Sequence, residues 1–225
     1  MSARLALYWA PELDDPLHAL GSTWLGRDAE TGATLPQPSV AGLDLPALTA
    51  DARGYGLHAT LKPPFRFAAP YAEVRAAAMD LAARTRPFVL PTLVPSDLHG
   101  FIALREAEPC APLNALADAC VAALDRFRLP ATPEEMARRR PERMTPRQRE
   151  LLDRWGYHYV FEEWFFHVTL SRRLDAVERD VLMPAVQAHF APALTVRRHV
   201  RQLCLFSQVG PGAPFLLAER LPLLG

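Results

Sequence analysis

Two of the seven histidines stand in matching four-residue words of the sequence. His58 and Thr60 belong to the word HATL, and His167 and Thr169 belong to the word HVTL. Because side chains two residues apart on a β-strand point to the same face, each word presents an imidazole beside a hydroxyl. A neutral imidazole accepts a proton near neutral pH, and a protonated imidazole donates one. Two such words facing one cleft therefore predict hydrolysis of a phosphodiester, with the hydroxyls hydrogen-bonded to its non-bridging oxygens.

Further polar residues follow the two words along the same expected strands. Lys62 shares the face of Thr60 if the strand continues, and its ammonium would then offset negative charge on the phosphate. The proline that follows Lys62 could instead tilt the Lys62 side chain outward. Ser171 takes the equivalent place after the second word. Arg66 and Arg172 are candidates for binding a second phosphate. Three tyrosines precede the words and either stack on a base or sugar or pack between lobes: Tyr55, Tyr157 and Tyr159.

The expected chemistry requires no metal ion or other cofactor. A dinuclear metal site would need Asp or Glu near the histidines, and neither word has an acidic residue on its polar face. The three cysteines, Cys110, Cys120 and Cys204, lack the CxxC or Cys/His spacing of a zinc site. We therefore expect them to be reduced, structural thiols.

The pattern of strands and helices places the two words at equivalent points of a repeated order of elements. Residues 57–67 and 164–171 have the composition of strands, and each is followed by a helix and then by strands. Two related lobes packed side by side are the simplest interpretation. The other expected elements are strands 4–9, 87–94, 98–105, 194–200, 202–208 and 214–220, and helices 16–25, 71–85, 112–127 and 175–190. Asp15 is placed to cap the first of these helices, and Asp175 with Glu178 three residues later has the pattern of a capping box for the last.

Two segments lie outside the repeat. Residues 26–56 are rich in Gly, Pro, Asp and Thr, and such a long excursion is either a lid over a site or a surface insertion. Residues 130–156 contain two helix starts of one design, with Thr at the cap, Pro next and Glu or Gln third. The seven arginines of this second segment form either a phosphate-attracting patch or a solvated helix pair with internal ion pairs.

Composition restricts the class of partner. The 225 residues include 25 basic and 25 acidic side chains, so the chain lacks the net positive charge of a generic polyanion binder, although this does not exclude a nucleic acid. Lys62 is the only lysine beside 24 arginines, which indicates a coding bias. No stretch approaches the roughly 18 apolar residues of a membrane span, and the N-terminal residues lack the pattern of a signal peptide. We expect a cytoplasmic monomer that binds a small phosphorylated substrate and no membrane.

The paired HATL and HVTL words resemble the signature of the two-histidine (2H) phosphoesterase superfamily, which has two copies of His-x-Thr or Ser followed by a hydrophobic residue. This superfamily includes RNA 2′,3′-cyclic phosphodiesterases and 2′,5′-RNA ligase-like proteins. Longer stretches look like the branch encoded beside carbon–phosphorus lyase genes for phosphonate use. They are YGLHATLKPPFRF at 55–67, RWGYHYVFEEWFFHVTLS at 154–171, and ALYWAP and STWLGRD nearer the N-terminus.

The resemblance implies an α+β fold for residues 1–225, as a single domain of two pseudo-symmetric lobes. Their antiparallel sheets would flank a central cleft, with the helices on the outside. The lobes would cover about 50–128 and about 157–225, linked by the helical connector at about 130–156. Strand 4–9 would join the two sheets.

The resemblance also implies a metal-independent hydrolase of phosphodiester bonds. His58 and His167 would be the acid–base pair, in either order, and Thr60 and Thr169 would bind the phosphate. The branch implies a small cyclic phosphate as substrate, such as a phosphoribosyl 1,2-cyclic phosphate from phosphonate breakdown. Two alternatives stay open: an RNA or nucleotide 2′,3′-cyclic phosphodiesterase, and a non-catalytic sensor of a phosphate ligand.

Overall fold

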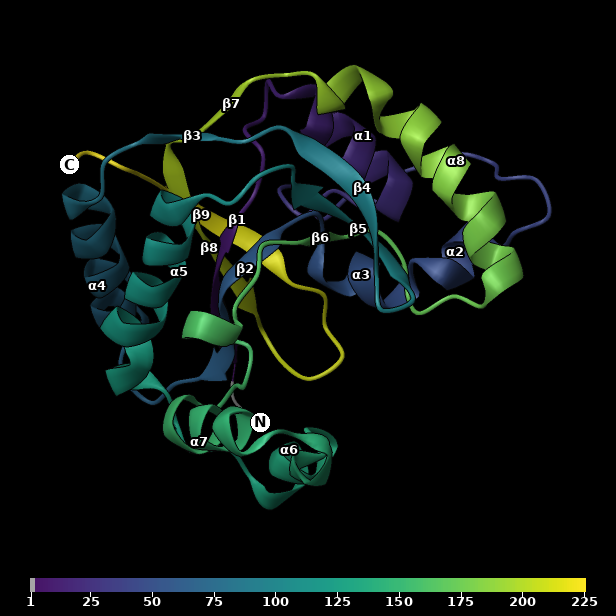
Figure 1. The fold of residues 1–225 in the computed structure, drawn as a ribbon. Coiled ribbons are helices and arrows are strands. Elements are labelled where there is room, and N and C mark those ends of the chain that lie inside the picture. Colours follow the sequence, from purple (N-terminus) through teal and green to yellow (C-terminus); the bar gives the residue numbers. More distant parts are fainter. Residues whose placement is uncertain (1–2) are drawn as a thin grey trace.

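The computed structural model describes residues 3–225 and shows a seven-stranded antiparallel sheet together with a second sheet of two strands (Figure 1). The predicted α+β class, with antiparallel sheets, is confirmed. The strands are β1 (Arg4–Trp9), β2 (Ala59–Arg66), β3 (Phe88–Leu90), β4 (Leu93–Leu98), β5 (Phe101–Glu106), β6 (Val168–Thr169), β7 (Arg198–Val200), β8 (Gln202–Gln208) and β9 (Leu216–Pro222). The α-helices are α1 (Pro16–Leu25), α2 (Leu45–Leu48), α3 (Ala50–Tyr55), α4 (Tyr71–Arg84), α5 (Ala111–Leu124), α6 (Pro133–Arg138), α7 (Pro146–Trp155) and α8 (Ala176–Leu194).

The strands that carry the two histidine words are neighbours in the middle of the large sheet. Its strand order is β4-β5-β6-β2-β1-β8-β9, and β3 pairs with β7 in the small sheet. β2 and β6 pair through Ala59 and Val168, the residues that follow the two histidines. β1 lies between β2 and β8. The large sheet is therefore continuous across both halves of the chain, and it brings the two words side by side.

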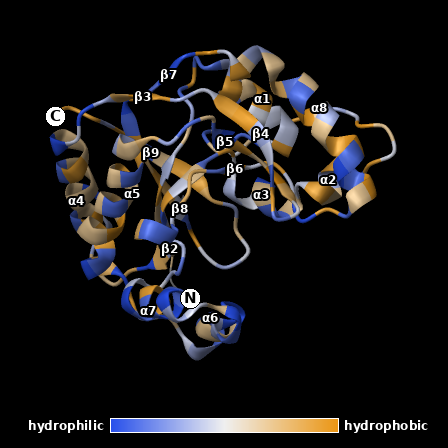
Figure 2. Ribbon diagram, in the orientation of Figure 1, coloured by the Kyte–Doolittle hydropathy of each residue, from blue (hydrophilic) through white to orange (hydrophobic). Residues whose placement is uncertain are grey.

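The two faces of the large sheet have different partners. Along β1, Leu5 and Leu7 point into the main hydrophobic core, which also holds apolar side chains of α1, α2, α4, α5 and α8. The alternate residues Ala6 and Tyr8 point to the opposite face and join a smaller cluster. Figure 2 shows that α4, α5 and α8 each carry both hydrophobic and hydrophilic residues, and most of the buried apolar residues of these helices belong to the main core. Among the described residues, no helix is long and apolar enough to cross a membrane.

The capping signals found in the sequence are confirmed. The carboxylate of Asp15 accepts a hydrogen bond from the backbone N–H of Leu17 at 2.8 Å at the start of α1. Thr132, Thr145 and Asp175 form capping boxes at the starts of α6, α7 and α8. These motifs depend on residues within one helical turn, so the sequence identifies them without knowledge of the fold.

Three expected strands differ from the structure. Expected strand 87–94 is divided between β3 of the small sheet and the start of β4 in the large sheet. Expected strand 164–171 is reduced to the two residues of β6, because the chain on either side leaves the sheet. Expected strand 194–200 begins too early, because α8 continues to Leu194 through Pro184 and Pro192. A proline inside a helix removes a backbone hydrogen bond. Packing of α8 against the main core outweighs that loss.

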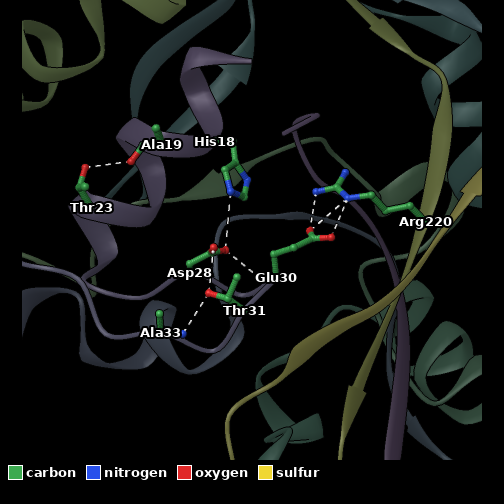
Figure 3. A network of polar contacts seen from close by, with 8 residues as sticks. All are labelled: His18, Ala19, Thr23, Asp28, Glu30, Thr31, Ala33 and Arg220. Carbon is green, nitrogen blue, oxygen red and sulfur yellow. Dashed lines mark hydrogen bonds and ion pairs between the residues drawn. The ribbon is translucent and has the colours of Figure 1, made fainter. Parts of the chain in front are cut away.

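The excursion over residues 26–56 is an ordered part of the fold. A network of polar contacts ties its first turn to the body (Figure 3). The His18 imidazole lies 3.6 Å from the Asp28 carboxylate, and the Arg220 guanidinium donates to the Glu30 carboxylate at 2.8 Å. The excursion then forms α2 and α3, and the end of α3 carries Tyr55 to the cavity described below.

Candidate active site

Both histidine words line one cavity of about 260 Å³. Thr60 reaches it from β2 and Thr169 from β6, and His58 and His167 reach it from the position just before each of these strands. The predicted sharing of a strand face within each word therefore holds in the structure. The cavity is also lined by residues from β1, β2, α3 and the segments that follow α6 and α7: Arg4, Tyr8, Asp51, Ala52, Tyr55, Pro63, Pro64, Arg139 and Tyr157.

The two imidazoles are oriented in the same way. Nδ1 of His58 lies 2.9 Å from the carbonyl oxygen of Gly56, and Nδ1 of His167 lies 3.1 Å from that of Phe165. A carbonyl oxygen only accepts hydrogen bonds, so Nδ1 is the protonated nitrogen of each neutral ring and Nε2 carries the lone pair. The Thr60 hydroxyl lies 3.4 Å from Nε2 of His58. Nε2 is therefore the atom of each histidine that is available for proton transfer.

Burial lowers the pKa of both histidines. It lowers the pKa of His58 to about 4, partly opposed by the hydrogen bond to the Gly56 carbonyl and assisted by the charge of His167. Burial also lowers the pKa of His167, opposed by the hydrogen bond to Phe165 and assisted by Arg105. Both rings are therefore mainly neutral at pH 7 in the free protein. A phosphate anion bound between them would raise both pKa values, because it stabilises the protonated form.

The Tyr8 ring stacks on the imidazole of His58 and supports it. The Tyr8 and His58 rings stack with their centroids 3.9 Å apart and their planes 26° apart. Tyr8 is fully buried, and burial raises the pKa of its phenol. Together with the Gly56 carbonyl, this stacking sets the plane and the direction of the imidazole. No local pattern in the sequence points to Tyr8, because the contact joins β1 to β2.

Gly56 provides a test of this positioning. It has φ +79°, and a Cβ at this position would lie 2.4 Å from the Cβ of Ala29. We expect Gly56→Ala to lower the free energy of unfolding by about 1–3 kcal/mol. The substitution should also lower kcat, because the Gly56 carbonyl that orients His58 must move. Gly54→Ala is the matched control, since Gly54 lies in α3 without positive φ and with no atom within 4 Å of the added Cβ. In thermal-unfolding and kinetic measurements, the stability and kcat of Gly54→Ala should be close to those of the wild type. Equal effects of the two substitutions would contradict this role of Gly56.

Lys62 does not reach the cavity, which corrects the prediction that its ammonium meets the phosphate. Its side chain is only 2% exposed. Nζ donates to the carbonyl oxygen of Val121 at 3.2 Å and lies 3.8 Å from the Asp125 carboxylate. Burial lowers the Lys62 pKa to about 8, and Asp125 opposes that shift. Lys62 is therefore a structural residue under the sheet.

The cause is a bulge in β2. Tyr8 lies opposite Thr60, but its neighbour Leu7 lies opposite Lys62, so β2 has one extra residue at this point. An extra residue turns the following side chains to the other face of the sheet. Lys62 thereby takes the same side as Leu7, towards the main core.

Three other predicted substrate-binding residues also lie outside the cavity. The Arg66 guanidinium pairs with the Glu135 carboxylate at 3.1 Å, and that of Arg172 pairs with Glu178 at 2.8 Å. Ser171 is buried, and its hydroxyl accepts from the Ile102 N–H at 3.0 Å and donates to the carbonyl of Arg172 at 2.9 Å.

The three predicted tyrosines have different positions. Tyr55 and Tyr157 line the cavity. Tyr159 is exposed, packs edge-on against Phe165 and does not line the cavity. The Tyr55 ring stacks on Phe215 with centroids 5.1 Å apart. Tyr55 and Tyr157 are therefore the predicted tyrosines that can contact a ligand in the cavity.

The distribution of charge around the cavity is uneven. Arg4 and Arg139 line it as cations, and Asp51 lines it as an acid. No pattern in the sequence pointed to Arg4 or Asp51, whereas Arg139 is one of the seven arginines of 130–156 for which a phosphate-attracting patch was one of two interpretations. Within residues 3–225, no three His, Cys, Asp or Glu side chains form a group that could hold a metal ion.

Known proteins with similar sequences are about twice as long as this chain. A protein of Janthinobacterium sp. (strain Marseille), named ribose 1,5-bisphosphate phosphokinase PhnN, is 38% identical over 231 residues, which cover 99% of this chain and 51% of that protein. A protein of the same name from Laribacter hongkongensis (strain HLHK9) is 39% identical over 226 residues, which cover 98% of this chain and 52% of that protein. The chain therefore spans about half the length of these relatives.

Solved structures also show similarity. The crystal structure of E. coli LigT complexed with phosphate has a TM-score of 0.47 and 15% identity, with all of both chains covered. A crystal structure of a phosphoesterase has a TM-score of 0.45 and 15% identity, also with all of both chains covered. The family described as "Protein of unknown function (DUF1045)" matches residues 60–216, a range that includes Thr60, His167 and Thr169 and begins just after His58. The chain is a member of this DUF1045 family.

Proposed function

We propose that this chain is a metal-independent phosphodiesterase that hydrolyses a small cyclic phosphate. The observation that carries the proposal is the pair of histidines in one cavity, each with Nδ1 bound to a carbonyl oxygen and Nε2 available. Thr60 and Thr169 lie beside them as hydroxyl donors. This is the set of groups that acid–base hydrolysis of a phosphodiester needs.

The proposed reaction is one displacement at phosphorus. Nε2 of neutral His58 accepts a proton from water as the water oxygen attacks the phosphorus. The P–O bond of the ring breaks, and Nε2 of protonated His167 gives its proton to the leaving oxygen. Thr60 and Thr169 donate hydrogen bonds to the non-bridging oxygens. We assign His58 as the base because burial lowers its pKa to about 4, which keeps it neutral, and the product is a phosphomonoester.

The architecture supports a pseudo-symmetric arrangement in which each half supplies one word. We propose that residues about 50–128 and about 157–225 are two pseudo-symmetric halves of a single domain, which exchange strands so that β6 of the second half lies between β5 and β2 of the first. The short strands β3 and β7, at equivalent points of the two halves, pair with each other. The hairpins β4–β5 and β8–β9 form the two edges of the large sheet.

The names of the relatives support a ribose phosphate as the substrate class. They are called ribose 1,5-bisphosphate phosphokinases, and this chain matches about half of their length. A kinase P-loop needs Gly-Lys followed by Ser or Thr, but Lys62 is the only lysine here and Pro63 follows it. We therefore assign the named kinase activity to the remainder of those proteins. A phosphoribosyl 1,2-cyclic phosphate, opened to a ribose phosphate during phosphonate catabolism, is the substrate we propose.

A substrate panel tests the proposal. We expect faster turnover of phosphoribosyl 1,2-cyclic phosphate than of 2′,3′-cyclic nucleotides, followed by release of a phosphomonoester. Faster turnover of the nucleotides would favour the alternative, for which Tyr55 and Tyr157 offer rings for a base. Binding of all the cyclic phosphates without turnover would indicate a sensor. EDTA should leave the rate unchanged, and loss of activity with EDTA would contradict the metal-independent mechanism.

The lowered pKa values predict the dependence of kcat/KM on pH. The base must be neutral and the acid protonated in the free protein, so kcat/KM should rise through about pH 4 and fall above the pKa of His167, which burial lowers. The maximum should therefore lie on the acid side of about pH 6.5, the ordinary pKa of histidine. The maximum of kcat should lie at higher pH, because the bound anion raises both pKa values. A flat profile between about pH 5 and 9 would contradict the histidine pair.

A further inference from the structure

Two arginines in the cavity lack a carboxylate partner. Arg4 on β1 and Arg139 just after α6 both line the cavity that holds the histidines. Nearby Arg66 is neutralised by Glu135 at 3.1 Å. By contrast, no carboxylate of residues 3–225 forms an ion pair with Arg4 or Arg139. Uncompensated guanidinium groups at the wall of a cleft attract anions and match the oxygens of a phosphate.

Both guanidinium groups are held in place by other contacts. Nε of Arg4 donates to the side-chain oxygen of Gln208 at 2.7 Å, and its guanidinium lies over the Phe215 ring, 5.3 Å from the centroid. The Arg139 guanidinium lies over the Tyr157 ring, 4.7 Å from the centroid. A guanidinium supported on an aromatic face loses little conformational freedom when it binds a ligand.

The position of Arg4 shows in which direction a ligand would extend. Arg4 and Tyr8 lie four residues apart on the same face of β1, about 13 Å along the strand, and Tyr8 stacks on His58. A second hollow of about 320 Å³ continues from the cavity and shares Arg4, Tyr55 and Arg139 with it. The cavity therefore has room for a ligand longer than a phosphodiester alone.

We propose that Arg4 and Arg139 form a second anion subsite, which binds a phosphomonoester at the far end of the cyclic phosphate substrate. This inference rests on the proposed function and assigns two residues of the cavity to the terminal phosphate of the proposed substrate. It assigns to Arg4 and Arg139 the role that the sequence suggested for Arg66 and Arg172. Asp51, the acid of the same cavity, is suited to accept hydrogen bonds from the sugar hydroxyls.

The test compares phosphoribosyl 1,2-cyclic phosphate with ribosyl 1,2-cyclic phosphate, which lacks the terminal phosphate. The wild type should have a kcat/KM about 10- to 100-fold higher for the phosphorylated substrate, as expected of charge-assisted hydrogen bonds. In Arg4→Gln and Arg139→Gln this preference should fall by at least about tenfold. Arg126→Gln is the control, because it also removes one positive charge but lies on the exposed surface against Phe127, and it should keep the wild-type preference.

Other outcomes separate the subsite from the proposed function. Hydrolysis of both substrates at equal kcat/KM by the wild type would overturn the subsite and leave the phosphodiesterase in place. Hydrolysis of neither would overturn the proposed function. If neither substrate is hydrolysed, calorimetric titration with ribose 5-phosphate and with ribose tests the subsite. Binding of ribose 5-phosphate that weakens at least about tenfold in Arg4→Gln and Arg139→Gln supports it, and binding that is equal in wild type and variants overturns it.

Discussion

His58→Ala and His167→Ala are each expected to lower kcat by about 10²- to 10⁴-fold, the range that positioned acid–base groups contribute. In the proposed mechanism each change removes the Nε2 that exchanges a proton with the reacting atoms, while the cavity itself stays open. Because His58 also stacks on Tyr8, His58→Gln is a useful second variant: it fills more of the space and cannot act as a base. Single-turnover hydrolysis of the cyclic phosphate measures the loss.

The control for this experiment is a histidine outside the cavity. His199 is exposed on β7, and His199→Ala should keep the wild-type kcat. Circular dichroism and thermal unfolding show whether each variant is folded. Wild-type kcat in a folded His58→Gln or His167→Ala variant would refute the assignment of the two histidines.

Lys62→Met is expected to change stability in a pH-dependent way and to leave hydrolysis near the wild-type rate. Methionine has a similar shape, and Asp125 keeps its ion pair with Arg128 at 2.7 Å. At pH 7 the variant should be as stable as wild type or more stable, because a buried charge is replaced by an apolar group. If Lys62 contacted the phosphate, this change would instead lower kcat/KM by orders of magnitude.

The sign of the pH effect follows from the lowered pKa of Lys62. Its pKa is about 8 in the folded protein, against the ordinary value of 10.5, so the unfolded chain binds the proton more tightly. The wild type should therefore gain stability relative to Lys62→Met as the pH rises from about 8 to about 10.5, by about 3 kcal/mol in total. Urea unfolding of both proteins across this range measures the difference. A constant difference would show that Lys62 is not buried as a charge.

Local patterns in the sequence predicted the parts of the structure that depend on near neighbours. The cap at Asp15 and the capping boxes at Thr132, Thr145 and Asp175 are confirmed, because each involves residues within one helical turn. The spacing of each histidine word placed its imidazole and hydroxyl on one strand face. The repeated order of elements then indicated that the two words belong together.

Long-range contacts explain what the sequence did not predict. Whether Lys62 points to the cavity depends on the pairing of β2 with β1, which contains the bulge. Arg66 is drawn away from the cavity by Glu135, which lies far along the chain. Arg4 and Tyr8 reach the site because β1 is inserted between β2 and β8. None of these contacts leaves a local pattern of residue types.

In the proposed mechanism one phosphate group is bound between two histidines from separate halves of the chain. A crystal structure of the protein soaked with vanadate, which can imitate the transition state at phosphorus, tests it most directly. We expect the vanadate to lie within hydrogen-bonding distance of Nε2 of both His58 and His167, with the Thr60 and Thr169 hydroxyls on its remaining oxygens. Vanadate bound elsewhere, with the space between the two imidazoles left empty, would contradict the account.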